Sequence, residues 1–95
     1  MEQAVVKVLY QEDATDHEER GTHFAFPTIW LERWSAPGEH RIHYIVTYGE
    51  RSRALQWLGQ GPHIARLDAR TDSEAIRTAI AIYDDLVEDW LREGT

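Results

Sequence analysis

Apolar positions near the C-terminal end of the chain recur at helical spacing and predict a helix over residues 73 to 93. These positions are Ala75, Ile76, Ala79, Ile80, Tyr83, Leu86, Val87, Trp90 and Leu91. Thr71 and Glu74 have the spacing of a capping box, which marks the start of a helix. The opposite face carries carboxylates, on Asp84, Asp85, Glu88 and Asp89. This helix is therefore expected to pack one face against the rest of the protein.

The other apolar segments are short and rich in β-branched and aromatic residues, which favours strands. The predicted strands cover residues 4–10, 23–34, 39–49, 53–58 and 63–68. The second and third form a hairpin around Ser35-Ala36-Pro37-Gly38. The last two form another hairpin with Trp57 opposite Ile64, although the fourth segment equally fits a short helical turn. We expect one α+β domain over residues 1–95, an antiparallel sheet of four to five strands with the C-terminal helix on one face.

The first hairpin can be given a register, because placing Trp34 opposite Glu39 gathers its apolar residues on one face. That face, the candidate core, carries the pairs Leu31–Ile42, Ile29–Tyr44, Pro27–Val46 and Ala25–Tyr48. The other face carries Glu32–Arg41, Trp30–His43, Thr28–Ile45 and Phe26–Thr47. Opposite charges at Glu32 and Arg41 support this register. Pro27 lacks an N–H, so its strand is expected to be an edge strand or to be bulged there.

One helix of this length covers only one face of such a sheet, so the other face meets water or a partner. The predicted register gathers aromatic and basic side chains on that uncovered face, namely Phe24, Phe26, Trp30, Trp34, Arg41 and His43. Aromatic residues and Arg are enriched at the centres of protein interfaces. This face is therefore a candidate binding surface. The alternative is that Trp30 merely stacks on His43 while the N-terminal strand shields the rest.

The charge balance points to the kind of partner, because 17 acidic and 10 basic residues give a formal net charge of −7. An acidic run that reads as a solvated loop, together with the helix carboxylates, could steer a basic protein surface toward the chain. The run comprises Glu12, Asp13, Asp16, Glu18 and Glu19. Binding of a single nucleic-acid strand is an alternative, since Arg51, Arg53, Arg66 and Arg70 outnumber the acids between residues 51 and 72. The net charge argues against it.

Catalytic motifs are missing from the sequence: it has no phosphate-binding glycine loop, no nucleophile elbow and no His-Glu-x-x-His. We therefore expect no enzymatic activity and no cofactor. A metal site is not expected either, because His40 and His43 would point to opposite faces of a strand. The chain has no Cys, which fits a reducing compartment, and its first residues resemble neither a signal peptide nor a membrane span. A cytoplasmic protein is expected.

These observations favour a small acidic, non-catalytic protein that binds a protein partner as an inhibitor or adaptor. In size and charge alone, the chain is similar to small inhibitors encoded by phages and to small immunity proteins. The first alternative is a homodimer formed through the same aromatic face or through an exposed edge of the 23–34 strand. The second alternative is single-stranded nucleic-acid binding through that face.

Overall fold

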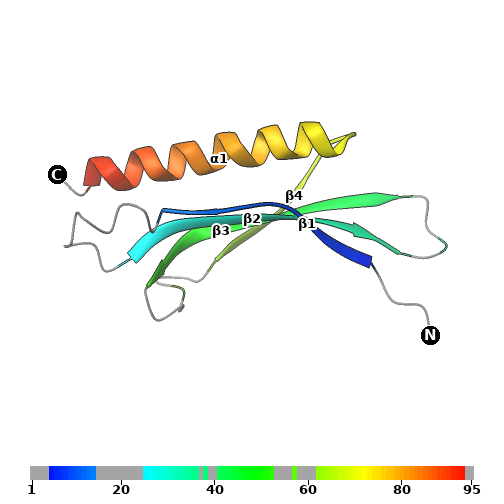
Figure 1. Ribbon diagram of the computed structural model, residues 1–95, viewed down its shortest axis with the longest axis horizontal. Helices are drawn as coiled ribbons and strands as arrows, with labels where there is room; N and C mark the ends of the chain where they lie inside the picture. Colours follow the sequence, from blue (N-terminus) through cyan, green and yellow to red (C-terminus); the bar gives the residue numbers. More distant parts are fainter. Residues whose placement is uncertain are drawn as a thin grey trace.

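The computed structural model describes residues 5–14, 25–36, 38, 41–52, 57 and 62–93. They form strands β1 (Val5–Asp13), β2 (Ala25–Ser35), β3 (Ile42–Ser52) and β4 (His63–Leu67), followed by helix α1 (Asp72–Glu93). The strands form one antiparallel sheet in the order β1-β2-β3-β4. Helix α1 lies along one face of this sheet (Figure 1). The predicted α+β architecture, an antiparallel sheet with one C-terminal helix, is confirmed.

Helix α1 begins with the capping box that the sequence predicts. The Glu74 N–H donates to Thr71 Oγ1 at 3.1 Å, and the Ala75 N–H donates to the Thr71 carbonyl at 3.1 Å. The Glu74 carboxylate reaches back to accept the Arg70 N–H at 3.4 Å. Side-chain acceptors at this end satisfy N–H groups that have no partner within the helix. The helix starts at Asp72, one residue earlier than predicted.

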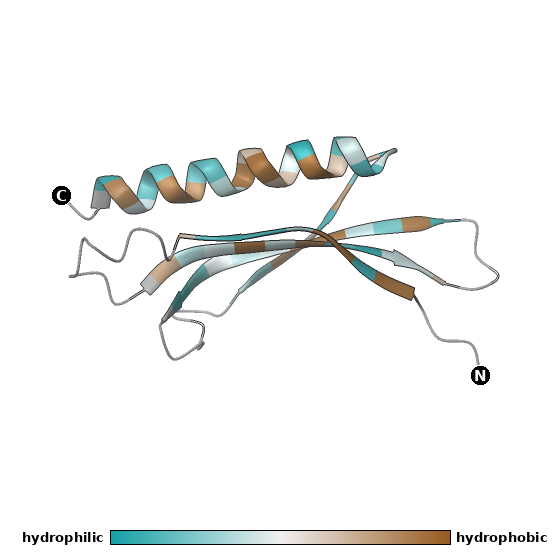
Figure 2. Ribbon diagram, in the orientation of Figure 1, coloured by the Kyte–Doolittle hydropathy of each residue, from teal (hydrophilic) through white to brown (hydrophobic). Residues whose placement is uncertain are grey.

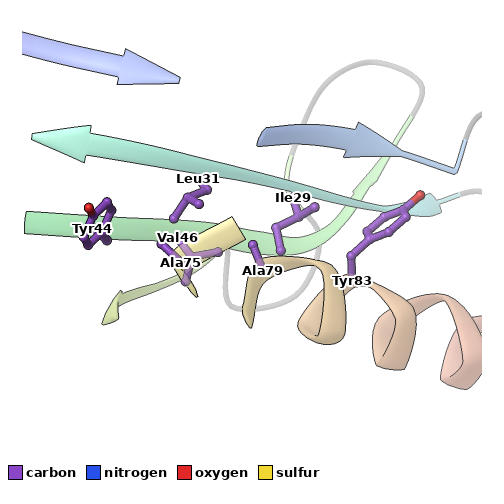
Figure 3. Packing of buried hydrophobic residues seen from close by; sticks show 7 residues of the cluster. All are labelled: Ile29, Leu31, Tyr44, Val46, Ala75, Ala79 and Tyr83. Atoms are coloured by element: carbon purple, nitrogen blue, oxygen red, sulfur yellow. The ribbon is translucent and has the colours of Figure 1, made fainter. Parts of the chain in front are cut away.

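The core lies between α1 and the middle of the sheet (Figure 3). It joins sheet residues to one row of helix residues, in the cluster Ile29, Leu31, Tyr44, Val46, Ala75, Ala79 and Tyr83. Ala75 and Ala79 carry small side chains, so the helix backbone can approach the sheet closely. Ile80 was predicted to belong to the apolar face but is 38% exposed, while Ile82 packs against the core. Ile80 follows Ala79 directly and so points about 100° away from the buried row.

The predicted register of the β2–β3 hairpin is wrong by four residues: Trp34 pairs with His43, not with Glu39. Glu32 consequently pairs with Ile45, while Arg41 lies before β3 and is exposed. The apolar pattern that suggested the predicted register is met equally by any shift of an even number of residues. The exposed ion pair that supported it contributes only about 0–1 kcal/mol. The observed register places Leu31 opposite Val46 in the core. Because the shift is an even number of residues, the apolar side chains remain on the predicted face.

Two further expectations about strand position are also wrong. β2 is not an edge strand, since β1 and β3 flank it. Pro27 fits inside the sheet because its carbonyl accepts the Ala14 N–H at 3.0 Å, just past the last β1–β2 pair, Asp13–Thr28. The N and C=O of a residue in an antiparallel strand point the same way, so the missing N–H faces the end of β1 and not β3. An edge of β2 is therefore unavailable for dimerisation.

The predicted pairing of Trp57 with Ile64 is wrong as well, because β4 pairs with β3 and Ile64 lies opposite Thr47. Trp57 instead forms an isolated bridge with Arg51. The rest of the predicted 53–58 strand lies outside the described residues. The sheet is thus a four-stranded meander whose edge strands are β1 and β4.

Candidate functional site

The side of the sheet opposite α1, hereafter the open face, carries residues that pair directly across the strands and therefore point the same way. From the hairpin end inward, the rows are Val6–Trp34–His43, then Val8–Glu32–Ile45–Arg66, then Gln11–Trp30–Thr47–Ile64, then Asp13–Thr28–Gly49. In Figure 1, α1 covers only the opposite face. The two Trp and His43 share one face as predicted, although in different pairs.

A β-bulge in β1 decides which of its residues reach the open face. The register with β2 shifts between Val8 and Tyr10, so that Leu9 is the extra residue. Val8 therefore lies on the open face, whereas Tyr10, opposite Leu31, packs against the core. The largely apolar first half of β1, brown with one teal band in Figure 2, consequently supplies both Val6 and Val8 to the open face.

Several large apolar side chains on the open face are accessible to solvent. Exposed fractions are 41% for Val6, 51% for Val8, 36% for Trp34 and 67% for Ile64. They come from β1, β2 and β4, and half-buried Ile45 of β3 lies between them. An apolar group that spans several strands differs from singly scattered surface residues and is typical of an interaction surface.

Trp57 packs on the other end of the open face. Its ring centroid lies 5.6 Å from that of Trp30, and the Arg51 guanidinium carbon lies 5.0 Å from the Trp57 ring and 5.9 Å from the Trp30 ring. Gly49 permits this contact, because a Cβ there would stand 3.2 Å from Trp57 Cζ3. Thr47, in the row of Trp30, and Thr28, in the row of Gly49, are both buried. Trp30 is therefore half-buried by its own chain, and Trp34 is the more accessible of the two Trp residues predicted to lie on this face.

A hollow of about 310 Å³ lies beside Trp30, lined by Val8, Gln11, Trp30, Glu32 and Arg51. It has opposite charges at its two ends, because Arg51 stacks on the Trp30 and Trp57 rings while Glu32 lies one row nearer to Trp34. Glu32 is half-buried, and within the described residues no hydrogen bond or ion pair reaches its carboxylate. The hollow thus combines an aromatic wall with a carboxylate that has no cation.

The acidic residues predicted as partner contacts are not gathered on the open face. Asp84, Asp85, Glu88 and Asp89 are exposed on α1, which covers the other side of the sheet. Glu12 lies opposite Ile29 of the core face, and Asp13 lies opposite Thr28 of the open face. Among the remaining predicted contacts, Phe26 is half-buried opposite Arg51, while Phe24, Asp16, Glu18 and Glu19 lie outside the described residues.

Sequence reasoning missed Val6, Val8, Ile64, Trp57 and Arg51 as parts of this surface. It placed Glu32 on this face, but only as the partner of Arg41. The β-branched run of residues 4–10 predicted a strand, but its outward face depends on the bulge, which leaves no mark in the hydrophobic pattern. The contact between Trp57 and Trp30 joins residues far apart in sequence, so no local pattern reports it.

Burial raises the pKa of the Tyr10 hydroxyl, and the Glu12 and Asp84 carboxylates add to the increase. Tyr10 faces α1, away from the hollow. Within the described ranges, no three or more His, Asp or Glu side chains are grouped closely enough to hold a metal ion. In the same residues, no helix combines the length and the apolar character that crossing a bilayer requires.

Comparison of the chain with protein-family models, with curated proteins and with solved structures finds no match. The geometry of the open face is therefore the basis for proposing a function.

Proposed function

We propose that this chain is a non-catalytic protein-interaction domain, an inhibitor or adaptor that docks a protein partner on the open face and acts in the cytoplasm. The observation that carries the proposal is the exposed apolar group of Val6, Val8, Trp34 and Ile64 on the side of the sheet opposite α1. Burying such side chains against a partner is favourable by roughly 25 cal/mol for each Å² of apolar surface. Trp is also the residue type most enriched among the energetic centres of interfaces.

The distribution of charge supports a role for the helix carboxylates in approach and not in close contact. The helix carboxylates lie on the other side of the sheet, so they cannot touch a partner seated on the open face. Long-range attraction still acts through the net charge of −7 and accelerates association with a basic partner, an effect that weakens as salt is added.

Site-specific photo-crosslinking in cells of the source organism tests the proposal. A benzophenone amino acid is placed at Val8 or at Ile64 on the open face, and at exposed Ala81 on α1 as the control. The expected result is one discrete crosslinked protein shared by the two open-face positions and missing from the control. Crosslinks to a second copy of this chain would replace the proposal with self-association, and identical products from all three positions would contradict it.

Reconstitution with the purified partner then measures the contribution of Trp34. Trp34→Ala is expected to weaken binding by about 2 kcal/mol, roughly thirtyfold, as truncation of an interface anchor does. The matched control is Ile80→Ala, which removes an exposed apolar side chain from α1. It is expected to leave the affinity within about twofold, since ordinary surface substitutions change free energies by less than about 0.5 kcal/mol. Equal losses in the two variants would contradict docking on the open face.

A further inference from the structure

Glu32 stands in an apolar and aromatic setting that is unusual for a carboxylate. Its neighbours across the strands are Val8 and Ile45, and its neighbours two residues away on the same face of β2 are Trp30 and Trp34. The side chain is half-buried, so these neighbours remove part of its hydration. Charged groups in such surroundings are normally paired. Within the described residues no cation pairs with Glu32.

Three basic side chains lie around Glu32 on the open face. His43, opposite Trp34, is one row away, and neither it nor the two arginines forms an ion pair with Glu32 within the described residues. Arg51 lines the hollow from its other end, where its guanidinium lies over Trp30 and Trp57. Arg66 lies in the same row as Glu32, but the β3 residue Ile45 separates the two. The Glu32 end of the hollow is therefore negative, with an indole ring on each side of the carboxylate along β2.

The geometry points to a subsite for an arginine side chain of the docked protein, with its guanidinium on Glu32 and against Trp30 or Trp34. This inference rests on the proposed function, since it names the chemistry of the partner. A planar guanidinium can pair with a carboxylate through two parallel hydrogen bonds and can stack on an indole at the same time, which an ammonium does less well. The chain itself shows guanidinium–indole packing at Arg51.

The size and the charge of the hollow fit an arginine side chain. The volume of about 310 Å³ accommodates the end of one side chain, and Arg51 at the far end confines a second cation to the Glu32 end. The subsite also continues into exposed Val8 and Trp34, which the backbone around an inserted arginine could cover. A chain of net charge −7 favours a basic partner in any case.

Titration with N-acetyl-L-arginine amide tests the subsite without any partner protein. In NMR spectra of the full ¹⁵N-labelled chain, the indole N–H signals of Trp30, Trp34, Trp57 and Trp90 report four positions. Saturable shifts are expected for Trp30 and Trp34 at ligand concentrations on the order of millimolar. Buried Trp90 on α1 should not respond. Equal shifts from the neutral isostere N-acetyl-L-citrulline amide, or the lack of a shift at Trp30 and Trp34, would overturn the inference.

Charge variants assign the effect to Glu32. Glu32→Gln is expected to weaken binding of the arginine probe at least about tenfold, as for a hydrogen bond to a charged group. Glu50→Gln, which removes the same charge from an exposed position of β3, should leave binding within twofold. Equal weakening by both variants would indicate general attraction, and equal affinity for N-acetyl-L-lysine amide would rule out guanidinium selectivity. Crosslinking at Val8 and Ile64 can still succeed if this titration fails, so the subsite and the proposed function can be refuted separately.

Discussion

Asp72 joins three elements of the fold, and its removal gives the sharpest test of the packing of α1. The carboxylate lies in the first turn of α1 and accepts hydrogen bonds from Arg33 Nη1 of β2 at 2.6 Å and from the Tyr44 hydroxyl of β3 at 2.7 Å. Asp72→Ala would remove both bonds while leaving the Thr71 cap in place. The helix would then lose this polar attachment to the central hairpin.

The expected loss of stability in Asp72→Ala follows from how exposed Asp72 and its two hydrogen-bond partners are. The side chains of Asp72 and Arg33 are 38% and 30% exposed, so their ion pair is expected to contribute only about 0.5 kcal/mol. The Tyr44 residue is 3% exposed, and a buried hydroxyl that loses its acceptor costs about 1–3 kcal/mol. A negative charge in the first turn of a helix adds about 0.3–1 kcal/mol. We therefore expect Asp72→Ala to lower the free energy of unfolding by about 2–4 kcal/mol.

Urea denaturation followed by circular dichroism measures this loss, and Asp85→Ala on the exposed side of α1 provides the control, expected within about 0.5 kcal/mol of the parent. In a domain of this size, a loss of 2 kcal/mol lowers Tm by roughly 8–16 °C. A double-mutant cycle with Tyr44→Phe should give a coupling energy of about 1 kcal/mol, because the two side chains share a hydrogen bond. A loss below about 0.5 kcal/mol for Asp72→Ala, or zero coupling, would refute the reasoning.

Three further outcomes are expected. Burial and the hydrogen bond to Asp72 raise the pKa of Tyr44 above the usual 10.0, so its contribution to stability is fully present below that pH and is lost as the pH rises through the folded-state value. Urea titrations should accordingly show the advantage of the parent over Tyr44→Phe shrinking above pH 10.0, and a constant difference would contradict this. Leu31→Ala removes a fully buried core side chain and should lower the free energy of unfolding by roughly 2–5 kcal/mol, whereas a loss under about 1 kcal/mol would place Leu31 outside the core. Gly49→Ala should displace Trp57, because the new Cβ would stand 3.2 Å from Trp57 Cζ3 and the backbone has φ +151°; unchanged near-ultraviolet circular dichroism would argue against that contact.

The elements that could be predicted from the sequence are those set by local periodicity. The helix and its Thr71–Glu74 cap follow from helical spacing, and the core face of the hairpin follows from alternation. Ile29, Leu31 and Val46 lie in the core as predicted because a shift of four residues keeps every side chain on its face.

The parts that sequence reasoning missed depend on contacts between distant segments. Pairing Glu32 with Arg41 favoured the wrong register. The structure has a different register, because an exposed ion pair is too weak to oppose burial of Leu31 against Val46. The same pairing concealed Glu32 as a carboxylate without a cation in the described structure. Likewise, the position of Trp57 over Gly49 depends on the path of the chain between β3 and β4 and not on a local pattern.

The bulge at Leu9 also bears on how this sheet avoids uncontrolled association. β1 is an edge strand nine residues long, and a regular edge of that length would offer a row of backbone donors and acceptors to a neighbouring molecule. The extra residue interrupts that row midway, while the opposite edge strand, β4, is only five residues long. Deleting Leu9 would leave Val8 and Tyr10 opposite consecutive residues of β2 and would straighten the edge. Such a variant should polymerise edge to edge more readily, so the irregularity guards against the backbone-mediated stacking that leads to fibrils.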